Sequence, residues 1–400
     1  MNLSEFFRTR EVSLPRSGFE TAKCTFDQYL RTAFHGYIAG VQRIDDPEYP
    51  NICEQVVRLL PELKRISQRI VSATKYFLDG YPHQAYRAVK KSLHGAQFEN
   101  FITELSSFDP AAPTPPSSPF LEITYHPSLY RMRPHLELAD AANLTRKDIF
   151  HVPFENRHLV SNQRYSIAGL PCLYLGGSAW ICWEELNRPD LNGAIFSSFR
   201  FAECTKVLDF QLSPNEAWDV YEGIQKTSRS DNPHPRIGEM LRKFGDDYIV
   251  SYILFWPLIA ACSIRVERKK GEFFPQYIIP QLLLQWVTKH RKVDGIRYFS
   301  TRAAKPNYFV NLNYVFPTKN IKFAGRCSYL QKKLQLLPPV QWRILQLFQS
   351  QQKFSPWRGM TVGQIQLAES LIIPYRDTEF YQLEEHFAAR DESDWGPVED

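Results

Sequence analysis

The chain has 400 residues, of which 44% are hydrophobic and 23% are charged. It is therefore long enough for two or three domains and apolar enough to bury a full core, which excludes a chain that is disordered throughout. The net charge of +5 arises from 48 basic and 43 acidic residues, a mixed surface that does not indicate nucleic-acid binding.

The seven cysteines are scattered, with neither a CxxC pair nor a Cys/His cluster at zinc-binding spacing. Because most of them have apolar neighbours, we expect reduced core residues, no metal site and a reducing compartment. The N-terminal sequence MNLSEFFRTREV carries charges where a signal peptide has its apolar centre. We therefore expect a cytoplasmic protein.

Apolar residues recur at three- and four-residue intervals from about residue 25 to residue 108, which predicts a helical N-terminal domain over residues 1–108. Within it, Asp79-Gly80 ends one helix, and the pattern from Phe98 to Leu105 indicates a last one. Prolines then crowd the segment SFDPAAPTPPSSPF, which suits neither a helix nor a central strand. We place a linker over residues 109–120.

Beyond the linker, short strands alternate with helices. The pattern predicts strands near residues 123–133, 264–267, 296–300 and 309–316, and helices near residues 218–226 and 279–287. Tyr248 to Ile264 is the most apolar run, but at about 17 residues it is at the low limit for a membrane span, and Pro257 interrupts it. We therefore expect a buried helix there, followed by a strand, and no membrane span.

The segment from Ile149 to Leu186 combines glycines, prolines, aromatic residues and paired polar residues. A polar turn at Asn162–Tyr165 precedes a short apolar strand, and Ser178 is a good N-cap for a helix that carries Glu185. A strand, a glycine turn and a helix N-terminus together can seat a phosphate or a carboxylate. The alternative is a buried strand–helix connection with solvated glutamates.

Two arginines, Arg131 and Arg133, lie on a segment of strand character beside Tyr130. An arginine fork held by a strand suits a phosphate, although a single arginine is more often paired with a carboxylate. Arg164 has the same two interpretations.

Two further side chains could act on a nucleotide. Tyr174 could stack on a planar ring or be an ordinary core tyrosine. Glu185 could stabilise a developing sugar cation, although a glutamate on a helix is usually solvated. Ser300, at the end of a predicted strand, is uninformative by itself.

Taken together, these segments resemble the RES-domain family, which is named for its arginine, glutamate and serine. The resemblance covers roughly residues 123–320, with a helical N-terminal domain like that of longer members. The segments that carry it are Leu129–Arg133, Asn162–Tyr165, Gly169–Leu175, Ser178–Glu185 and Asp294–Ser300. Where the family commonly has Gly-Gly-Arg-Trp-Asn, this chain has Asn-Gln-Arg-Tyr-Ser at residues 162–166, and the region around residues 205–250 is an insertion that could narrow or regulate the cleft.

The resemblance implies an α+β fold. It predicts a RES domain over residues 121–330 that is related to ADP-ribosyltransferases and binds NAD in a central cleft. The sequence pattern itself predicts a C-terminal extension over residues 331–400, with helical pieces and a mobile acidic tail. By carry-over, Arg131 would hold the phosphates or ribose of NAD, with Arg164 as a second candidate. Tyr174 would pack on the nicotinamide side, Glu185 would stabilise the oxocarbenium-like state, and Ser300 would complete the pocket.

The implied function is cleavage of the nicotinamide–ribose bond of NAD by hydrolysis or phosphorolysis, in a toxin or defence effector. Its partner could be a small helix-turn-helix (Xre-type) antitoxin. The alternatives are a protein ADP-ribosyltransferase and a non-catalytic nucleotide-sensing module that recruits a partner. The sequence leaves open the acceptor, a protein target, the antitoxin and the oligomeric state.

A third class of function comes from the helical domain. Arg87 and His94 have the R-x(4–6)-H spacing of HEPN ribonucleases, which cleave RNA without a metal ion. The same spacing recurs in the pairs Arg146/His151 and Arg229/His234, so it is close to what chance produces.

Overall fold

The computed structural model describes residues 1–105, 128–134, 144–229, 237–267, 271–303, 310–342, 364–368 and 371–399. The protein has the expected α+β fold. Its contacts divide it into two compact units. The first, here called the helical unit, comprises Met1–Thr103, Asn162–Ile167 and Leu208–His290; the second, the sheet unit, comprises Glu104–Ser161, Ala168–Val207 and Arg291–Asp400.

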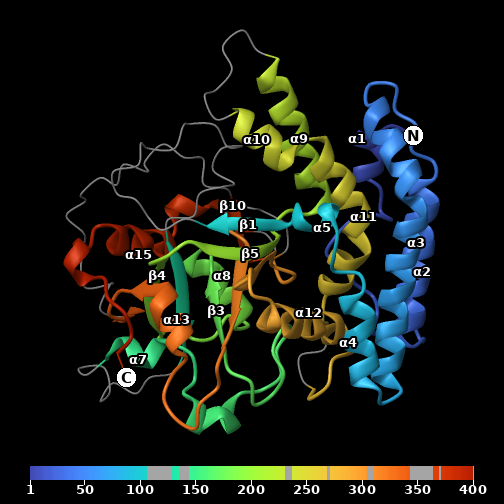
Figure 1. Cartoon of the computed structure of the whole chain (residues 1–400). Helices are drawn as coiled ribbons and strands as arrows, with labels where there is room; N and C mark the ends of the chain where they lie inside the picture. The colour runs from blue at the N-terminus through green and yellow to red at the C-terminus, as the bar shows by residue number, and fades with distance from the viewer. Residues whose placement is uncertain are drawn as a thin grey trace. The chain divides into compact units, whose positions relative to one another are not determined.

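The described helices of the helical unit are, in chain order, α1 (Leu3–Phe7), α2 (Phe26–Val41), α3 (Pro50–Leu78), α4 (Pro82–Lys90), α5 (Ala96–Glu99), α9 (Pro214–Ser228), α10 (Ile237–Phe244), α11 (Asp246–Cys262) and α12 (Ile278–Lys289). Helices α2 to α5 confirm the helical pattern that the apolar periodicity after residue 25 predicts. Helices α2 and α3 lie side by side (Figure 1). Helix α3 ends where expected, because Gly80 takes a left-handed backbone conformation with φ of 86° and lets the chain turn into α4.

Helix α11 confirms the buried helix expected from the apolar run. Every residue from Tyr248 to Cys262 is buried, because a helix that is apolar on all sides must be covered on all sides. Trp256 stacks on Tyr37 at a centroid distance of 3.9 Å, and its indole N–H donates to the Val12 carbonyl at 2.8 Å. The expected strand after α11 is reduced to one bridge between Arg16 and Ile264. Among the described helices, none has both the length and the apolar character that a membrane crossing requires.

The two units do not follow the contiguous boundaries expected from the sequence. Residues 208–290, expected inside the RES domain, belong with residues 1–103. The physical reason is burial, since α11 packs most extensively against α3, and Phe7 of α1 stacks on Trp218 of α9 at 5.5 Å. The region around residues 205–250, expected as an insertion at the cleft, therefore belongs mainly to the helical unit. The expected linker at residues 109–120 lies outside the described residues.

Within the described residues, the main sheet has nine strands. They are β1 (Ile102–Leu105), β2 (Leu129–Arg133), β3 (Cys172–Gly176), β4 (Ile195–Phe201), β5 (Thr205–Phe210), β6 (Gly295–Phe299), β7 (Leu312–Pro317), β8 (Leu334–Leu336) and β9 (Val340–Gln341). Their order is β1-β5-β6-β7-β3-β2-β4-β8, with β9 also paired to β4, and the division between the units passes through β1 and β5. The strands expected near residues 123–133, 296–300 and 309–316 are confirmed in their described parts. The helix expected across Phe98–Leu105 is wrong in its second half, which is strand β1.

Alternating side chains give the sheet two different faces. Leu173, Leu175 and Tyr314 belong to one buried cluster, which also contains Phe150 and Phe316. Tyr130 and Met132 belong to a second buried cluster, together with Ala179–Cys182 of helix α8 (Ala179–Glu185) and Phe387 of α15 (Glu379–Ala388). We call these the α7 face and the α8 face, after the short helix that each contacts; α7 is Arg146–Ile149.

The C-terminal extension contributes the strand pair β10 (Gln364–Ala368) and β11 (Leu371–Pro374), followed by helix α15. Phe380 of α15 lies against Trp183 and Trp342, with ring centroids 5.5 and 5.0 Å away. The helical pieces expected in the extension are thus present in α15, and this part of the chain is an integral layer of the sheet unit. Residues 343–363 lie outside the described part.

Candidate functional site

Glu185 is the centre of a polar cluster in the sheet unit. One carboxylate oxygen, Oε1, accepts hydrogen bonds from the Ser300 hydroxyl at 2.6 Å and the Asn313 amide at 2.7 Å. The other oxygen, Oε2, lies 3.3 Å from Nε of Arg302. The Glu185 side chain is 31% exposed, whereas Ser300 and Asn313 are buried. The carboxylate is therefore fixed by buried hydrogen-bond donors while its side chain remains partly open to solvent. We call Glu185, Ser300, Arg302 and Asn313 the Glu185 cluster.

The connection between β3 and α8 sets the position of Glu185. As expected, Ser178 is the N-cap of α8, and its hydroxyl oxygen accepts from the Ile181 N–H at 3.1 Å. The same hydroxyl donates to the Val310 carbonyl at 2.7 Å, which ties the start of the helix to the chain before β7. Gly176 must be glycine, because a Cβ atom there would lie 2.6 Å from Cγ2 of Ile181. The glycine turn therefore brings α8 close against the sheet.

Ser300 and Asn313 come from the neighbouring strands β6 and β7. Tyr298 of β6 pairs with Asn313 of β7, and Ser300 follows two residues later, where its N–H donates to the Asn311 carbonyl at 2.7 Å. Side chains two residues apart on a strand share a face, so Ser300 and Asn313 both point to the α8 face. The structure thus brings together Glu185 and Ser300, which the sequence separates by more than a hundred residues.

Sequence reasoning missed Asn313 and Arg302. Asn313 interrupts a strand that is otherwise apolar and aromatic, and an amide in a buried strand must find a partner. That interruption was a usable signal. Arg302 lies two residues after Ser300, in a bend that no periodicity marks.

Arg131 is not in contact with the Glu185 cluster. It alternates with Tyr130 and Met132, so its side chain belongs to the α7 face, whereas Ser300 and Asn313 belong to the α8 face. Its guanidinium donates to the Tyr174 carbonyl at 3.3 Å. Strands β2 and β3 share a single described residue pair, Tyr130 with Gly176, so Arg131 lies where this ladder stops. Burial, and next the neighbouring charge of Arg133, lower the pKa of Arg131 to about 9, at which it is still charged at neutral pH.

Tyr174 and Arg164 occupy different units. Tyr174 is half-buried on β3, and its position in the ladder places its side chain on the α8 face with Asn313. Arg164 belongs to the helical unit, where it donates to the carbonyls of Cys262 and Ile264 at 3.2 and 2.9 Å and lies over the Tyr277 ring. These two hydrogen bonds, both from Nη1 of Arg164, hold the polar turn at Asn162–Tyr165 to the end of α11. The guanidinium expected to bind phosphate is therefore engaged in a structural contact.

The N-terminus of α8 seats a carboxylate, as its sequence predicts. That carboxylate is Glu384 of α15, whose Oε1 accepts from the Ala179 N–H at 2.6 Å and from the Tyr375 hydroxyl at 2.5 Å. Burial raises the pKa of Glu384 to about 8, although both hydrogen bonds favour the charged form and lower it. The C-terminal extension is therefore bonded directly to the helix that carries Glu185.

Cys182 lies on the same helix as Glu185 but is not a candidate nucleophile. Its thiol is buried and donates to the Tyr130 carbonyl at 3.2 Å. Burial raises the pKa of Cys182 to about 12, so the reactive thiolate is scarce at neutral pH.

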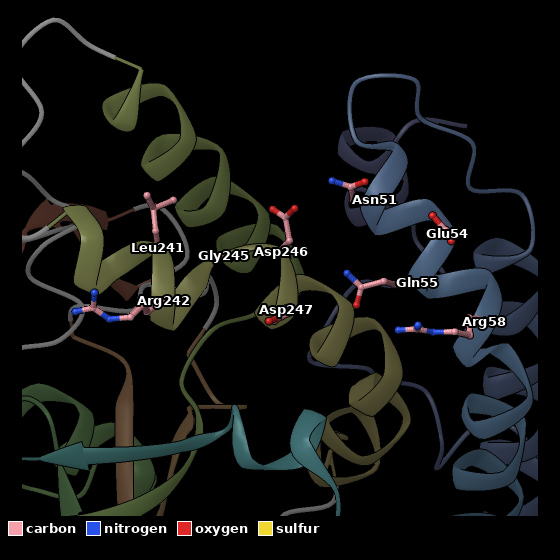
Figure 2. Close-up of a pocket in the computed structure, with 9 residues that line it drawn as sticks. All are labelled: Asn51, Glu54, Gln55, Arg58, Leu241, Arg242, Gly245, Asp246 and Asp247. Atoms are coloured by element: carbon pink, nitrogen blue, oxygen red, sulfur yellow. The ribbon is translucent and has the colours of Figure 1, made fainter.

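A separate open cleft of about 880 Å³ lies within the helical unit, between α3 and the junction of α10 with α11 (Figure 2). The charged residues that line it are three acidic and two basic ones, Glu54, Asp246, Asp247, Arg58 and Arg242. None of the residues expected to bind NAD lines it, so the expected chemistry does not lie there.

The two residues with HEPN-like spacing lie on different local structures. Arg87 lies on α4, whereas His94 lies beyond the end of that helix, and both residues are exposed. Within the described part of the chain, no hydrogen bond or ion pair links the two. The ribonuclease alternative stays a prediction.

Comparison with known proteins gives one clear relative. The chain is 32% identical over 343 residues to the protein named "Putative toxin YopC" from Bacillus subtilis (strain 168), an alignment that covers 84% of this chain and 69% of the relative. The chain belongs to the same family. No family model matches it, and no solved structure matches it. Because this alignment covers 84% of the chain, it includes most of the helical unit as well as most of the sheet unit.

Proposed function

We propose that the protein is an NAD-degrading enzyme of the RES type that acts as a toxin or defence effector. The observation that carries the proposal is the Glu185 cluster, in which a partly exposed carboxylate is fixed by Ser300, Arg302 and Asn313. Two members of the cluster, Glu185 and Ser300, are residues that the resemblance to RES domains assigns to the site. The name of the Bacillus relative supports the toxin role.

In the proposed reaction the nicotinamide–ribose bond breaks before the acceptor attacks. The ribose ring then carries a developing positive charge, and the Glu185 carboxylate provides the opposite charge beside it. Ser300 and Asn313 both donate to Oε1, which fixes the direction of the carboxylate and removes the need to reorganise it during the reaction. Tyr174 on the same face would pack against the nicotinamide.

Arg131 can bind the phosphates of NAD only if the dinucleotide extends from one face of the sheet to the other. Because Arg131 lies on the α7 face, a dinucleotide could reach both it and Glu185 only by passing the place where the β2–β3 ladder stops. The phosphates would then lie at that break in the sheet and the nicotinamide on the α8 face.

Incubation of the purified full-length protein with NAD, with nicotinamide release followed by chromatography, tests the proposal. We expect Glu185→Gln to lower the rate by at least about 100-fold, the loss typical of removing one group that stabilises transition-state charge. Glu184→Gln is the matched control, because Glu184 is the adjacent residue of α8 and pairs with Arg188 at 2.8 Å outside the cluster. No release from the wild-type protein, or equal losses in both variants, would contradict the proposal.

The acceptor is decided in the same assay. Free ADP-ribose identifies water, ADP-ribose carrying an extra phosphate identifies inorganic phosphate, and label on a polypeptide identifies a protein acceptor. Tight NAD binding without turnover under all three conditions would instead identify a nucleotide-sensing module. A small helix-turn-helix protein encoded by the adjacent reading frame, and able to block nicotinamide release, would establish the expected antitoxin.

A further inference from the structure

Three arginines gather on the α7 face of the sheet unit. Arg131 and Arg133 are two residues apart on β2 and therefore share a face, and Arg326 precedes the buried Cys327 of the same face. Arg133 donates to the Phe150 carbonyl at 2.8 Å, and Arg326 donates to the Lys147 carbonyl at 3.0 Å. These carbonyls are three residues apart at the end of α7, so the two guanidinium groups are anchored within about one helical turn of each other.

None of the three guanidinium groups has an anionic partner in the described part of the chain, where no carboxylate oxygen lies within 4.0 Å of them. Each makes one hydrogen bond to a backbone carbonyl, although a guanidinium has five N–H donors. Nε of Arg326 is buried and makes no hydrogen bond. Asp148 offsets part of the charge at Arg133, but its carboxylate is bonded to the N–H and hydroxyl of Thr145 at 2.7 and 2.9 Å.

The three guanidinium groups are neighbouring positive charges with unused hydrogen-bond donors and no anion to balance them. Burial and the charge of Arg326 lower the pKa of Arg133, and burial and the charge of Arg133 lower that of Arg131. Both pKa shifts mean that the surroundings of Arg131 and Arg133 disfavour the charged guanidinium. A bound anion would reverse this cost and would supply acceptors for the unused donors. Arg131, Arg133 and Arg326 are each partly exposed as whole residues, so none of them is sealed in the core.

We propose that Arg131, Arg133 and Arg326 form a binding site for a phosphate-type anion on the α7 face, separate from the Glu185 cluster. A phosphate group fits better than a carboxylate because its oxygens, held in a tetrahedron, can accept from several guanidinium groups at once. The anion is either free phosphate or the phosphate group of a larger ligand such as a dinucleotide. Arg131 is also the residue to which the proposed function assigns the phosphates of NAD, but the site is defined by anion binding and not by NAD cleavage.

Binding of inorganic phosphate to the full-length protein by calorimetry, with chloride at equal ionic strength as the reference, tests this site. We expect Arg326→Gln and Arg133→Gln each to weaken phosphate binding about 10-fold or more, which is typical for the loss of a charge-assisted hydrogen bond. Arg390→Gln is the control, because Arg390 is an arginine of the same unit paired with Asp394 at 3.7 Å. Far-UV circular dichroism checks that each variant is folded, and Arg326→Lys, which keeps the charge, should retain part of the affinity.

A competition experiment with NAD distinguishes free phosphate from the diphosphate of a dinucleotide as the ligand. If NAD displaces phosphate, the site takes the diphosphate of the dinucleotide; if both bind together, it takes a separate phosphate. Phosphate binding no stronger than the chloride reference, or equal affinity in the wild type, Arg326→Gln and Arg133→Gln, would overturn the site. Because the experiment measures phosphate binding, its result is independent of NAD cleavage. A protein that does not cleave NAD can still bind phosphate at this site, and one that cleaves NAD can lack the site.

Discussion

Replacing Glu384 by glutamine should remove a defined part of the protein's pH-dependent stability. Burial raises the pKa of Glu384 from 4.5 to about 8, so the folded protein holds a proton that the unfolded chain has released between these values. A raised carboxyl pKa contributes its stability in full below about pH 4.5 and loses it as the pH rises to about 8. With these two pKa values the loss of stability between about pH 6 and pH 8 is at most about 2 kcal/mol.

The free energy of unfolding of the wild type and of Glu384→Gln, measured by urea denaturation at the two pH values, tests this prediction. The glutamine can still accept from the Ala179 N–H and the Tyr375 hydroxyl but does not ionise, so its stability should fall less than that of the wild type over this interval. Glu379→Gln, an exposed position on the same helix, should behave as the wild type does. An identical decrease in the wild type and Glu384→Gln would refute the reasoning, since Glu384 would then be ionised already at the lower pH.

Three further predictions concern packing and reactivity. Gly295→Ala should destabilise the fold by about 2 kcal/mol or more in urea denaturation, because the added Cβ would lie 2.5 Å from the ring of Phe316; an unchanged midpoint would mean that this part of the sheet yields. Trp256→Phe should cost about 1–3 kcal/mol, because it leaves a buried backbone carbonyl without its donor, and a thermal-unfolding midpoint equal to that of the wild type would contradict this. Cys182 and Cys262, each with a pKa raised to about 12 by burial, should react with a thiol reagent at about pH 8 only after denaturation. Rapid labelling of either one in the folded protein would show that the core opens.

The candidate site was only partly predictable. Ser178 and Glu185 follow from local rules, since an N-cap and a residue further along the same short helix depend on a few consecutive residues. The partnership of Glu185 with Ser300 needed the resemblance to a family, because no local rule links residues so far apart. Asn313 and Arg302 escaped because their role depends on strand register and on a bend, and register is fixed by pairing with neighbours that the sequence does not identify.

The sequence by itself determined several local features of the fold. Gly80 ends α3, Ser178 starts α8, and the apolar run from Tyr248 to Cys262 requires a buried helix, because turns, caps and periodicity act over a few residues. Only the tertiary structure decided which segments belong together. It assigned residues 208–290 to the helical unit, put Arg131 on the face opposite Ser300, and placed Glu384 at the start of α8, because burial and strand pairing join residues that are distant in the chain.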